Sequence, residues 1–254
     1  MSWAARRRFI ILLVVGIVVA AFAAIVLIST IYKTPTCTDG VKNQNEAGVD
    51  CGGPCPYLCM ADEQPPTVLY TKTITNSAGR TDIIASVENK NAAAAAKDVP
   101  YRVTFYDSDS ILLGTISGML DLPPGATVPV YIPSVLSSGH KVANAFLSID
   151  SSAPRWYSAV VDPRVVPAVS DIVQGGSVSA PRIEAILTNP SAYPLTNVQV
   201  IVVVENIQKE VLAASQTVVL NVPPEGQATA VFTWNDRFPG TPASIDIVPI
   251  IPLP

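Results

Sequence analysis

The sequence predicts an all-β chain of two tandem β-sandwiches, preceded by a single transmembrane helix and a small disulfide-rich segment. Three observations predict this: an uncharged apolar run at residues 9–31, four cysteines confined to residues 37–59, and a repeat at an offset of about 100 residues in the remainder. The 23 prolines and the many valines favour short strands between turns over helices.

The apolar run is long enough to cross a membrane. As a helix of roughly 23 residues at about 1.5 Å per residue it spans about 34 Å, against a hydrocarbon core of about 30 Å. Arg6, Arg7 and Arg8 precede it directly. The positive-inside bias therefore predicts a cytoplasmic tip at residues 1–8 and a single-pass cell-membrane protein whose C-terminal domains are extracytoplasmic.

A cleaved secretory signal is the alternative, because Ala21-Phe22-Ala23 resembles a small-x-small cleavage site. The apolar run continues through residues 24–28, however, and signal h-regions are shorter, at about 7–15 residues. An uncleaved anchor is favoured, and the remainder is exported in either case.

The charge of the exported part excludes some partners. The formal charge is −4; without Arg6, Arg7 and Arg8 the chain has 13 basic against 20 acidic residues, or −7. A nucleic-acid partner would require a basic face, so none is expected. The expected partners are the lipid bilayer, through one helix, and another envelope protein or surface polymer.

Residues 32–66 are predicted to form a cysteine-rich collar (32–59) followed by a short stiff linker (60–66). In an exported chain, an even number of clustered cysteines favours disulfides. Two bridges among four cysteines allow three connectivities, and the spacing does not choose among them. A zinc or iron–sulfur site is the alternative, but the usual CxxC pair or nearby histidine is missing. The cysteines are Cys37, Cys51, Cys55 and Cys59.

The collar also holds candidate calcium ligands, although no other cofactor is expected. Asp39, Asn43, Glu46 and Asp50 supply hard oxygen atoms near glycine turns, as Ca²⁺ requires. Their spacing is not that of an EF-hand loop. The competing interpretation is that these residues only form turns between crosslinks.

The collar resembles a short motif, C-x-D-G-x-x-N-x-x-E-x-x-V-D-C-G-G-x-C, that recurs in bacterial and archaeal surface proteins. The resemblance covers about 20 residues and implies a cell-surface context, with no catalytic role. The matching positions are Cys37, Asp39, Gly40, Asn43, Glu46, Val49, Asp50, Cys51, Gly52, Gly53 and Cys55.

The remainder of the chain repeats itself. The sequence LDLPPG at residues 120–125 is echoed by LNVPPEG at 220–226, and VEN at 87–89 by LTN at 187–189. A period of about 100 residues matches an immunoglobulin-like sandwich. The predicted domains are residues 67–155 and, with a linker, 156–254.

Strands are placed by alternation and turn signals. In residues 99–107, Tyr101, Val103 and Phe105 share one face, and Val200, Val202 and Val204 hold the equivalent places in the second copy. The five alanines at 92–96 are expected to form a loop. The predicted strands are 67–75, 81–89, 99–107, 111–116, 127–132 and 141–149, then 165–173, 181–188, 198–205, 211–220, 228–233 and 243–250.

The first copy resembles the FxLyD family of bacterial Ig-like domains. The resemblance rests on Val103-Thr104-Phe105-Tyr106-Asp107, then Leu113-Gly114-Thr115 and Leu122-Pro123-Pro124-Gly125. It covers about 50 residues and implies an extracellular β-sandwich of structural or binding type. The second copy departs from the pattern, with Val203-Val204-Glu205-Asn206 for the Phe-Tyr-Asp step and an expected insertion at Pro224-Glu225-Gly226.

Catalytic patterns are scarce. The single histidine, His140, is expected to face solvent in a turn, and Asp107 with Asp109 to cap backbone groups after a strand. Trp156, Tyr157 and Trp234 are candidates for an aromatic binding surface, with packing inside and between the sandwiches as the favoured alternative.

The sequence therefore predicts a non-enzymatic, membrane-anchored extracytoplasmic protein that presents its sandwiches for binding, adhesion or envelope assembly. The alternatives are an accessory subunit of a membrane complex, and a calcium-dependent sensor or enzyme with its site in the acidic collar.

Overall fold

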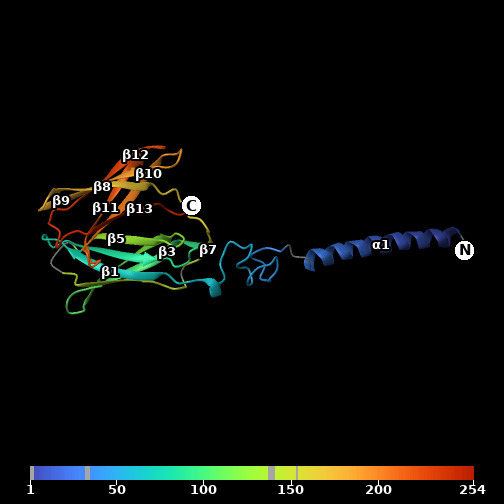
Figure 1. Cartoon of the computed structure of the whole chain (residues 1–254). Coiled ribbons are helices and arrows are strands. Elements are labelled where there is room, and N and C mark those ends of the chain that lie inside the picture. Colours follow the sequence, from blue (N-terminus) through green and yellow to red (C-terminus); the bar gives the residue numbers. More distant parts are fainter. Residues whose placement is uncertain (1–2, 32–34, 137–140, 153) are drawn as a thin grey trace. The chain divides into compact units, whose positions relative to one another are not determined.

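The computed structural model describes residues 3–31, 35–136, 141–152 and 154–254. The chain divides into two compact units, Met1–Cys59 and Met60–Pro254 (Figure 1). The predicted fold class is confirmed, because the chain is mostly β, its sheets form sandwich-like layers, one apolar helix lies at the N-terminus and the cysteines form disulfides.

The first unit begins with helix α1, Trp3–Ile31, which starts six residues before the predicted apolar run. The segment Arg6–Ser29 is long and apolar enough to cross a membrane, and all of its side chains are exposed. Its charged residues are confined to Arg6, Arg7 and Arg8. An exposed apolar surface of this length has no protein partner within its own unit.

The second unit opens with a short 3-10 helix, η1 (Met60–Asp62), and the first sequence repeat forms two antiparallel sheets. One sheet has the order β1-β2-β5 and the other the order β4-β3-β6, with β7 paired to β3. Their bounds are β1 Thr67–Thr75, β2 Thr81–Glu88, β3 Ala94–Tyr106, β4 Leu112–Leu122, β5 Thr127–Leu136, β6 Asn144–Ile149 and β7 Tyr157–Ser158.

The second repeat forms two further antiparallel sheets, with the orders β12-β9-β8 and β11-β10-β13. Figure 1 shows these strands as a separate set of layers. Their bounds are β8 Ala168–Ser177, β9 Ala180–Thr188, β10 Leu195–Glu205, β11 Val211–Val222, β12 Gln227–Thr233 and β13 Ser244–Ile250.

The predicted alternation of the central strands is confirmed. Val103 and Phe105 of β3 are buried, as are Val200, Val202 and Val204 of β10. The strands also keep equivalent partners, since Val103 lies opposite Leu147 and Val202 opposite Ile247. One face of each central strand therefore packs into its own sandwich.

The prediction of a loop at residues 92–96 is wrong for residues 94–96, which form the start of a strand. Strand β3 begins at Ala94, and Ala94 and Ala95 pair with Ser158 and Tyr157 of β7. Residues Ala94, Ala95 and Ala96 are all buried. Their small side chains suit a crowded strand, and this packing outweighs the weak strand preference of alanine.

The other face of two central strands forms the contact between the sandwiches, a feature that the alternation alone did not predict. Ile84 of β2, Ile201 and Val203 of β10 and Ala214 of β11 form one buried cluster. Strands β2 and β10 are thus buried on both faces, and the β1-β2-β5 sheet packs against the β11-β10-β13 sheet. Partly buried Tyr70, Ile74, Tyr131, Val211 and Ile250 surround the cluster.

The turn after the fourth strand of each copy contains no insertion, so the predicted insertion at 224–226 is wrong. Gly125 donates its N–H to the Asn91 carbonyl at 3.0 Å, and Glu225 donates its N–H to the Ser191 carbonyl at 2.9 Å. Glu225 therefore occupies the position of Gly125 and adopts the same left-handed backbone, with φ 49° against 57°.

The Asp107 turn is also retained in the second copy. Asp107 accepts N–H bonds from Asp109 and Ile111 at its Oδ1, as predicted for a capping residue. In the second copy, Asn206 accepts the same two bonds from Gln208 and Glu210. Asn206 thus replaces Asp107 in structure, although the sequence of the second copy differs from that of the first there.

Candidate functional site

The collar is closed by two crossed disulfides, Cys37–Cys55 and Cys51–Cys59. No free cysteine occurs among the described residues. Each bridge has one cysteine inside the loop that the other closes, because Cys51 lies between Cys37 and Cys55, and Cys55 between Cys51 and Cys59. The predicted disulfides are confirmed, and the structure selects one of the three connectivities that the spacing left open.

The predicted calcium ligands lie in the same loop, where their carboxylates accept hydrogen bonds from backbone N–H groups. Asp50 accepts the N–H groups of Asp39 and Gly40 at 3.0 and 2.9 Å, one on each carboxylate oxygen. Asp39 accepts the N–H groups of Val41 and Thr36 and the side-chain amide of Asn43. These charge-assisted bonds hold the turns between the crosslinks.

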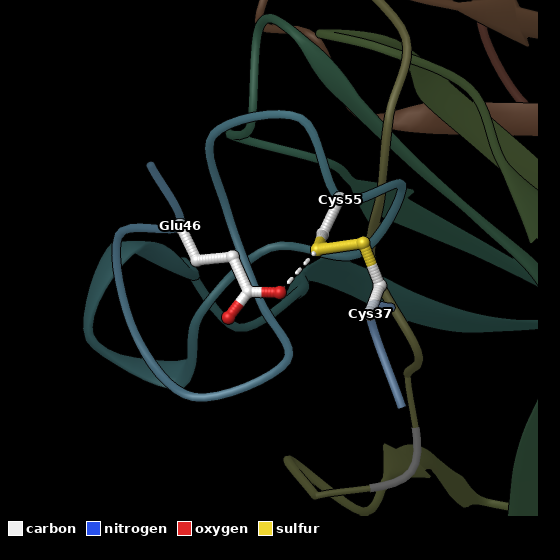
Figure 2. A group of neighbouring side chains, drawn as sticks. All are labelled: Cys37, Glu46 and Cys55. Atoms are coloured by element: carbon white, nitrogen blue, oxygen red, sulfur yellow. Dashed lines mark hydrogen bonds between the residues drawn. A yellow bond between two sulfur atoms is a disulfide. The ribbon is translucent and has the colours of Figure 1, made fainter. Parts of the chain in front are cut away.

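Glu46 is the buried member of the set, at 4% exposure. Its Oε2 accepts the N–H groups of Asn43 and Asp50 at 3.3 and 3.2 Å. Its Oε1 lies 3.1 Å from Sγ of Cys55 (Figure 2). A disulfide sulfur carries no hydrogen, so this is a close sulfur–oxygen contact that packs the carboxylate against the Cys37–Cys55 bridge.

These contacts bear on metal binding. The Sγ atoms of Cys37 and Cys55 and a carboxylate oxygen of Glu46 all lie within 4.8 Å of one another. Both sulfur atoms are already bonded to each other, and thiolates rather than disulfides bind metal. Each carboxylate oxygen of Asp39 and Asp50 accepts an N–H but keeps a further lone pair, so these bonds do not exclude a cation. Turn formation accounts for the contacts of Asp39 and Asp50, whereas Asn43 Oδ1 is buried without a hydrogen-bond partner in the described part of the chain. Calcium ligation by Asp39, Asn43, Glu46 and Asp50 stays a prediction.

A second candidate lies between the two sandwiches and was not predicted. This cleft has a volume of 770 Å³. It is bounded by the turn between β1 and β2, the start of β11 and the loop between β12 and β13, and we call it the Trp234 cleft. Its volume falls within the range of about 300–1,000 Å³ that is common for ligand sites. The polar and aromatic residues that line it include Asn76, Ser77, Arg80, Asp82, Tyr131, Trp234, Asn235, Asp236, Arg237 and Phe238.

Trp234 is held in place by its neighbours. Its indole Nε1 donates to the Ala214 carbonyl at 3.3 Å, and its backbone N–H to the Pro181 carbonyl at 3.1 Å. Phe238 packs against it edge-on, with ring centroids 5.1 Å apart. Trp234 is half-buried: it lines the cleft and also packs against the core of the second sandwich, as the favoured packing interpretation predicted. Trp156, in contrast, is fully buried and belongs to no binding surface.

The two carboxylates of the cleft accept hydrogen bonds from other residues of the unit. Asp82 accepts the Tyr131 hydroxyl and the Ser134 N–H, both at 2.8 Å. Burial, and then the bond to Asp82, raises the pKa of Tyr131 above its usual value. Asp236 accepts both the hydroxyl and the N–H of Ser77, which lowers the pKa of its carboxyl. The Ser77–Asp236 pair joins the two sandwiches at the cleft.

The two guanidinium groups of the cleft are far less engaged. Nε of Arg80 lies 3.8 Å from Asp82, and the Arg80 side chain is 55% exposed. Arg237 is exposed, and no carboxylate in the described part of the chain lies within 4.0 Å of it. Both cations are thus available to a ligand.

Other predicted residues are placed as follows. Asp107 and Asp109 lie in the turn after β3 and do not line the cleft. The C-terminal segment docks on its own unit, since Leu253 is buried and donates its N–H to Asp121 at 2.7 Å. His140 lies outside the described residues.

Comparisons with known proteins add little. No family model and no curated protein matches the chain. A solved structure that matches is the crystal structure of red sea bream transglutaminase, at 16% identity and a TM-score of 0.25, covering 73% of this chain and 29% of that one. The chain spans less than a third of that protein's length, and a TM-score this low supports no argument about fold or activity.

Proposed function

We propose that this chain is a non-enzymatic, single-pass membrane protein that displays its β-sandwiches outside the membrane for binding or envelope assembly. In this proposal α1 is the anchor, residues 1–8 are cytoplasmic, and the crosslinked collar separates the sandwiches from the bilayer. The lipid bilayer is one partner, and an envelope protein or surface polymer is the other.

The observation that carries the proposal is the full exposure of Arg6–Ser29 in a chain whose cysteines are paired. An apolar helix with no protein cover is stable inside lipid, where its backbone groups bond internally. Paired cysteines favour an oxidising compartment for the adjoining segment. The arginines before the helix favour a cytoplasmic N-terminus.

Two measurements on cells that express the full chain test the proposal. Alkaline carbonate should leave the protein in the membrane pellet, and its intact mass should include α1, which a cleaved signal would not. External protease should remove the sandwiches, and thiol-reactive polymer should label the chain only after reduction. Free thiols together with protection from external protease would show that the orientation is wrong.

A variant with Arg6, Arg7 and Arg8 replaced by glutamine provides the matched control. If these charges set the orientation, the variant will show partial protection of the sandwiches from external protease, while its carbonate resistance is unchanged.

One observation favours a second role, as an accessory subunit of a membrane complex. On the outer face of the β4-β3-β6 sheet, Leu112 lies opposite Tyr106, and Phe146 packs edge-on against Tyr106. Leu112 and Phe146 are 56% and 61% exposed. If this face binds a partner, Phe146→Ser will reduce the native assembly size in detergent, whereas Ser148→Ala on the same strand will not.

A further inference from the structure

We propose that the Trp234 cleft binds a neutral oligosaccharide, that is, a chain of uncharged hexose or N-acetylhexosamine units. This inference goes beyond the proposed function and does not depend on membrane anchoring, because the cleft lies wholly within the second unit.

The first argument is the combination of an aromatic ring with charged hydrogen-bonding groups. One face of a pyranose ring is made of C–H groups and packs on aromatic rings, which carry a large apolar surface. The Trp234 side chain is fixed by its indole bond to Ala214 and by its packing on Phe238, so little side-chain entropy is lost when a ligand covers it. Sugar hydroxyls both donate and accept, and bonds to charged partners are the stronger ones.

The second argument is the balance of charge. Arg80 and Arg237 are matched by Asp82 and Asp236, so the formal charge of these lining residues sums to zero. The chain as a whole is acidic, with a net charge of −4. An acidic polysaccharide would be repelled by the unit and would find no excess of positive charge in the cleft.

The third argument is that the cleft is not built to add a peptide strand. Strand β11 pairs with β10 on one side only. At its other edge, the Ala214 carbonyl already accepts the Trp234 indole N–H, and Leu212 lies against Gly240 of the loop between β12 and β13. A peptide that bound by β-augmentation would need these backbone groups free.

The fourth argument is that a second hollow neighbours the first. This hollow, of 460 Å³, shares Arg237, Phe238 and Gly240 with the Trp234 cleft. Its far side is the hairpin between β8 and β9, at Gln174–Val178 and Pro181. Two neighbouring hollows offer a chain of several sugar units more surface than a single one.

The test measures binding of hexasaccharides to the full chain by calorimetry and by Trp fluorescence. The detergent must lack a sugar headgroup, because a glucoside or maltoside would compete. The probes are cellohexaose and chitohexaose, which are neutral, and a hyaluronan hexasaccharide, which is acidic. We expect at least one neutral probe to bind with a Kd of about 10 μM to 1 mM, and the acidic probe at least about tenfold more weakly.

Three variants locate the site. Arg237→Gln removes an exposed cation that makes no ion pair among the described residues, and Trp234→Phe keeps the packing but loses the indole. Each should weaken binding about fivefold or more while the melting temperature of Arg237→Gln is unchanged. The control is Arg102→Gln, on the outer face of the β4-β3-β6 sheet, which should bind as the wild type does.

Three results would overturn the proposal. The first is no binding of either neutral hexasaccharide at 5 mM, a concentration about fivefold above the weakest Kd expected. The second is equal affinity of the wild type, Arg237→Gln and Trp234→Phe. The third is tighter binding of the hyaluronan probe, which would indicate a site for anions. None of these results bears on whether α1 spans the membrane, which the fractionation experiment decides separately.

Discussion

Asn89 and Asn189, one hundred residues apart, make equivalent hydrogen bonds to the Pro-Pro turn of their own copy, and differ in a third carbonyl, that of Ala94 or Tyr193. Asn89 donates Nδ2 to the carbonyls of Leu122 and Pro123, and Asn189 to those of Val222 and Pro223. The Oδ1 of each accepts the N–H two residues ahead, from Asn91 or Ser191. Each asparagine thereby fastens the end of the second strand of its copy to the Pro-Pro turn. The two copies therefore repeat hydrogen bonds as well as amino-acid sequence.

Replacing either asparagine should therefore destabilise the unit strongly. Asn189→Ala leaves buried carbonyls without their donor, and we expect a loss of about 1–3 kcal/mol in the free energy of unfolding. Denaturant unfolding of the full chain in detergent measures it. Asn235→Ala, at an exposed position, is the control and should change little. Equal effects of both substitutions would contradict the assigned role.

Glu225→Gly should stabilise the chain. Glu225 is exposed and holds a left-handed φ of 49°, where its equivalent Gly125 has 57°. A side chain in this region costs about 1 kcal/mol, so glycine should raise the unfolding free energy by about that amount. The reciprocal change Gly125→Ala should lower it, although the added Cβ meets only an ordinary 3.6 Å contact with Ala92. A gain in stability from Gly125→Ala would show that the backbone argument is wrong.

Ile201→Ala should test the contact between the sandwiches. Ile201 is 2% exposed and lies in the cluster shared with Ile84 of the first copy. Removing its buried methyl groups should cost about 2–5 kcal/mol. Val218→Ala in the neighbouring strand, where the side chain is 48% exposed, should cost less than about 1 kcal/mol. If both variants lose the same free energy of unfolding, the buried cluster does not stabilise the unit more than an exposed strand position does.

Acid should weaken the Ser77–Asp236 contact. The bonds from the Ser77 hydroxyl and N–H lower the pKa of Asp236 below its ordinary value of 3.8. A carboxyl with a depressed pKa in the folded state contributes stability that is fully present above the unfolded pKa and is lost as pH falls through the folded one. Melting temperatures between pH 7 and pH 2 should therefore fall less for Asp236→Asn and Ser77→Ala than for the wild type. Parallel pH profiles for all three proteins would count against this contact.

Calcium should leave the collar unchanged. At 10 mM calcium, a site with a Kd of about 0.1 mM would stabilise the folded state by about 2.7 kcal/mol. Because the carboxylates of Asp39 and Asp50 already hold the collar turns through backbone N–H groups without an ion, we expect no change in the rate at which dithiothreitol opens the two disulfides. Slower reduction that Asp50→Ala abolishes would establish the calcium site and make the collar a sensor.

The sequence predicted much of this arrangement, because strand alternation, turn residues and cysteine clustering are local signals. The bridge partners were not predictable, since all three pairings suit the same spacing. The contact between the sandwiches did have a signal: Ile83-Ile84-Ala85 and residues 200–204 are continuous apolar runs, which are typical of strands buried on both faces.

The Trp234 cleft had no comparable signal. Arg80 and Trp234 lie about 150 residues apart in the chain, and only the packing of one sandwich on the other brings them to one cleft. The insertion predicted at Pro224-Glu225-Gly226 is wrong because Glu225 adopts the positive φ that glycine holds in the first copy, and an acidic residue is unusual in that conformation.

The crossed bridges of the collar also determine how the chain carries mechanical load. Under tension applied at the two ends of the collar, force passes from Cys37 through its bridge to Cys55 and then to Cys59. The segment 38–54 lies outside this path, which removes about 60 Å of extensible contour at about 3.5 Å per residue. A tether built in this way is short and nearly inextensible until the Cys37–Cys55 bridge is reduced, whereas reduction of Cys51–Cys59 alone leaves this path unchanged.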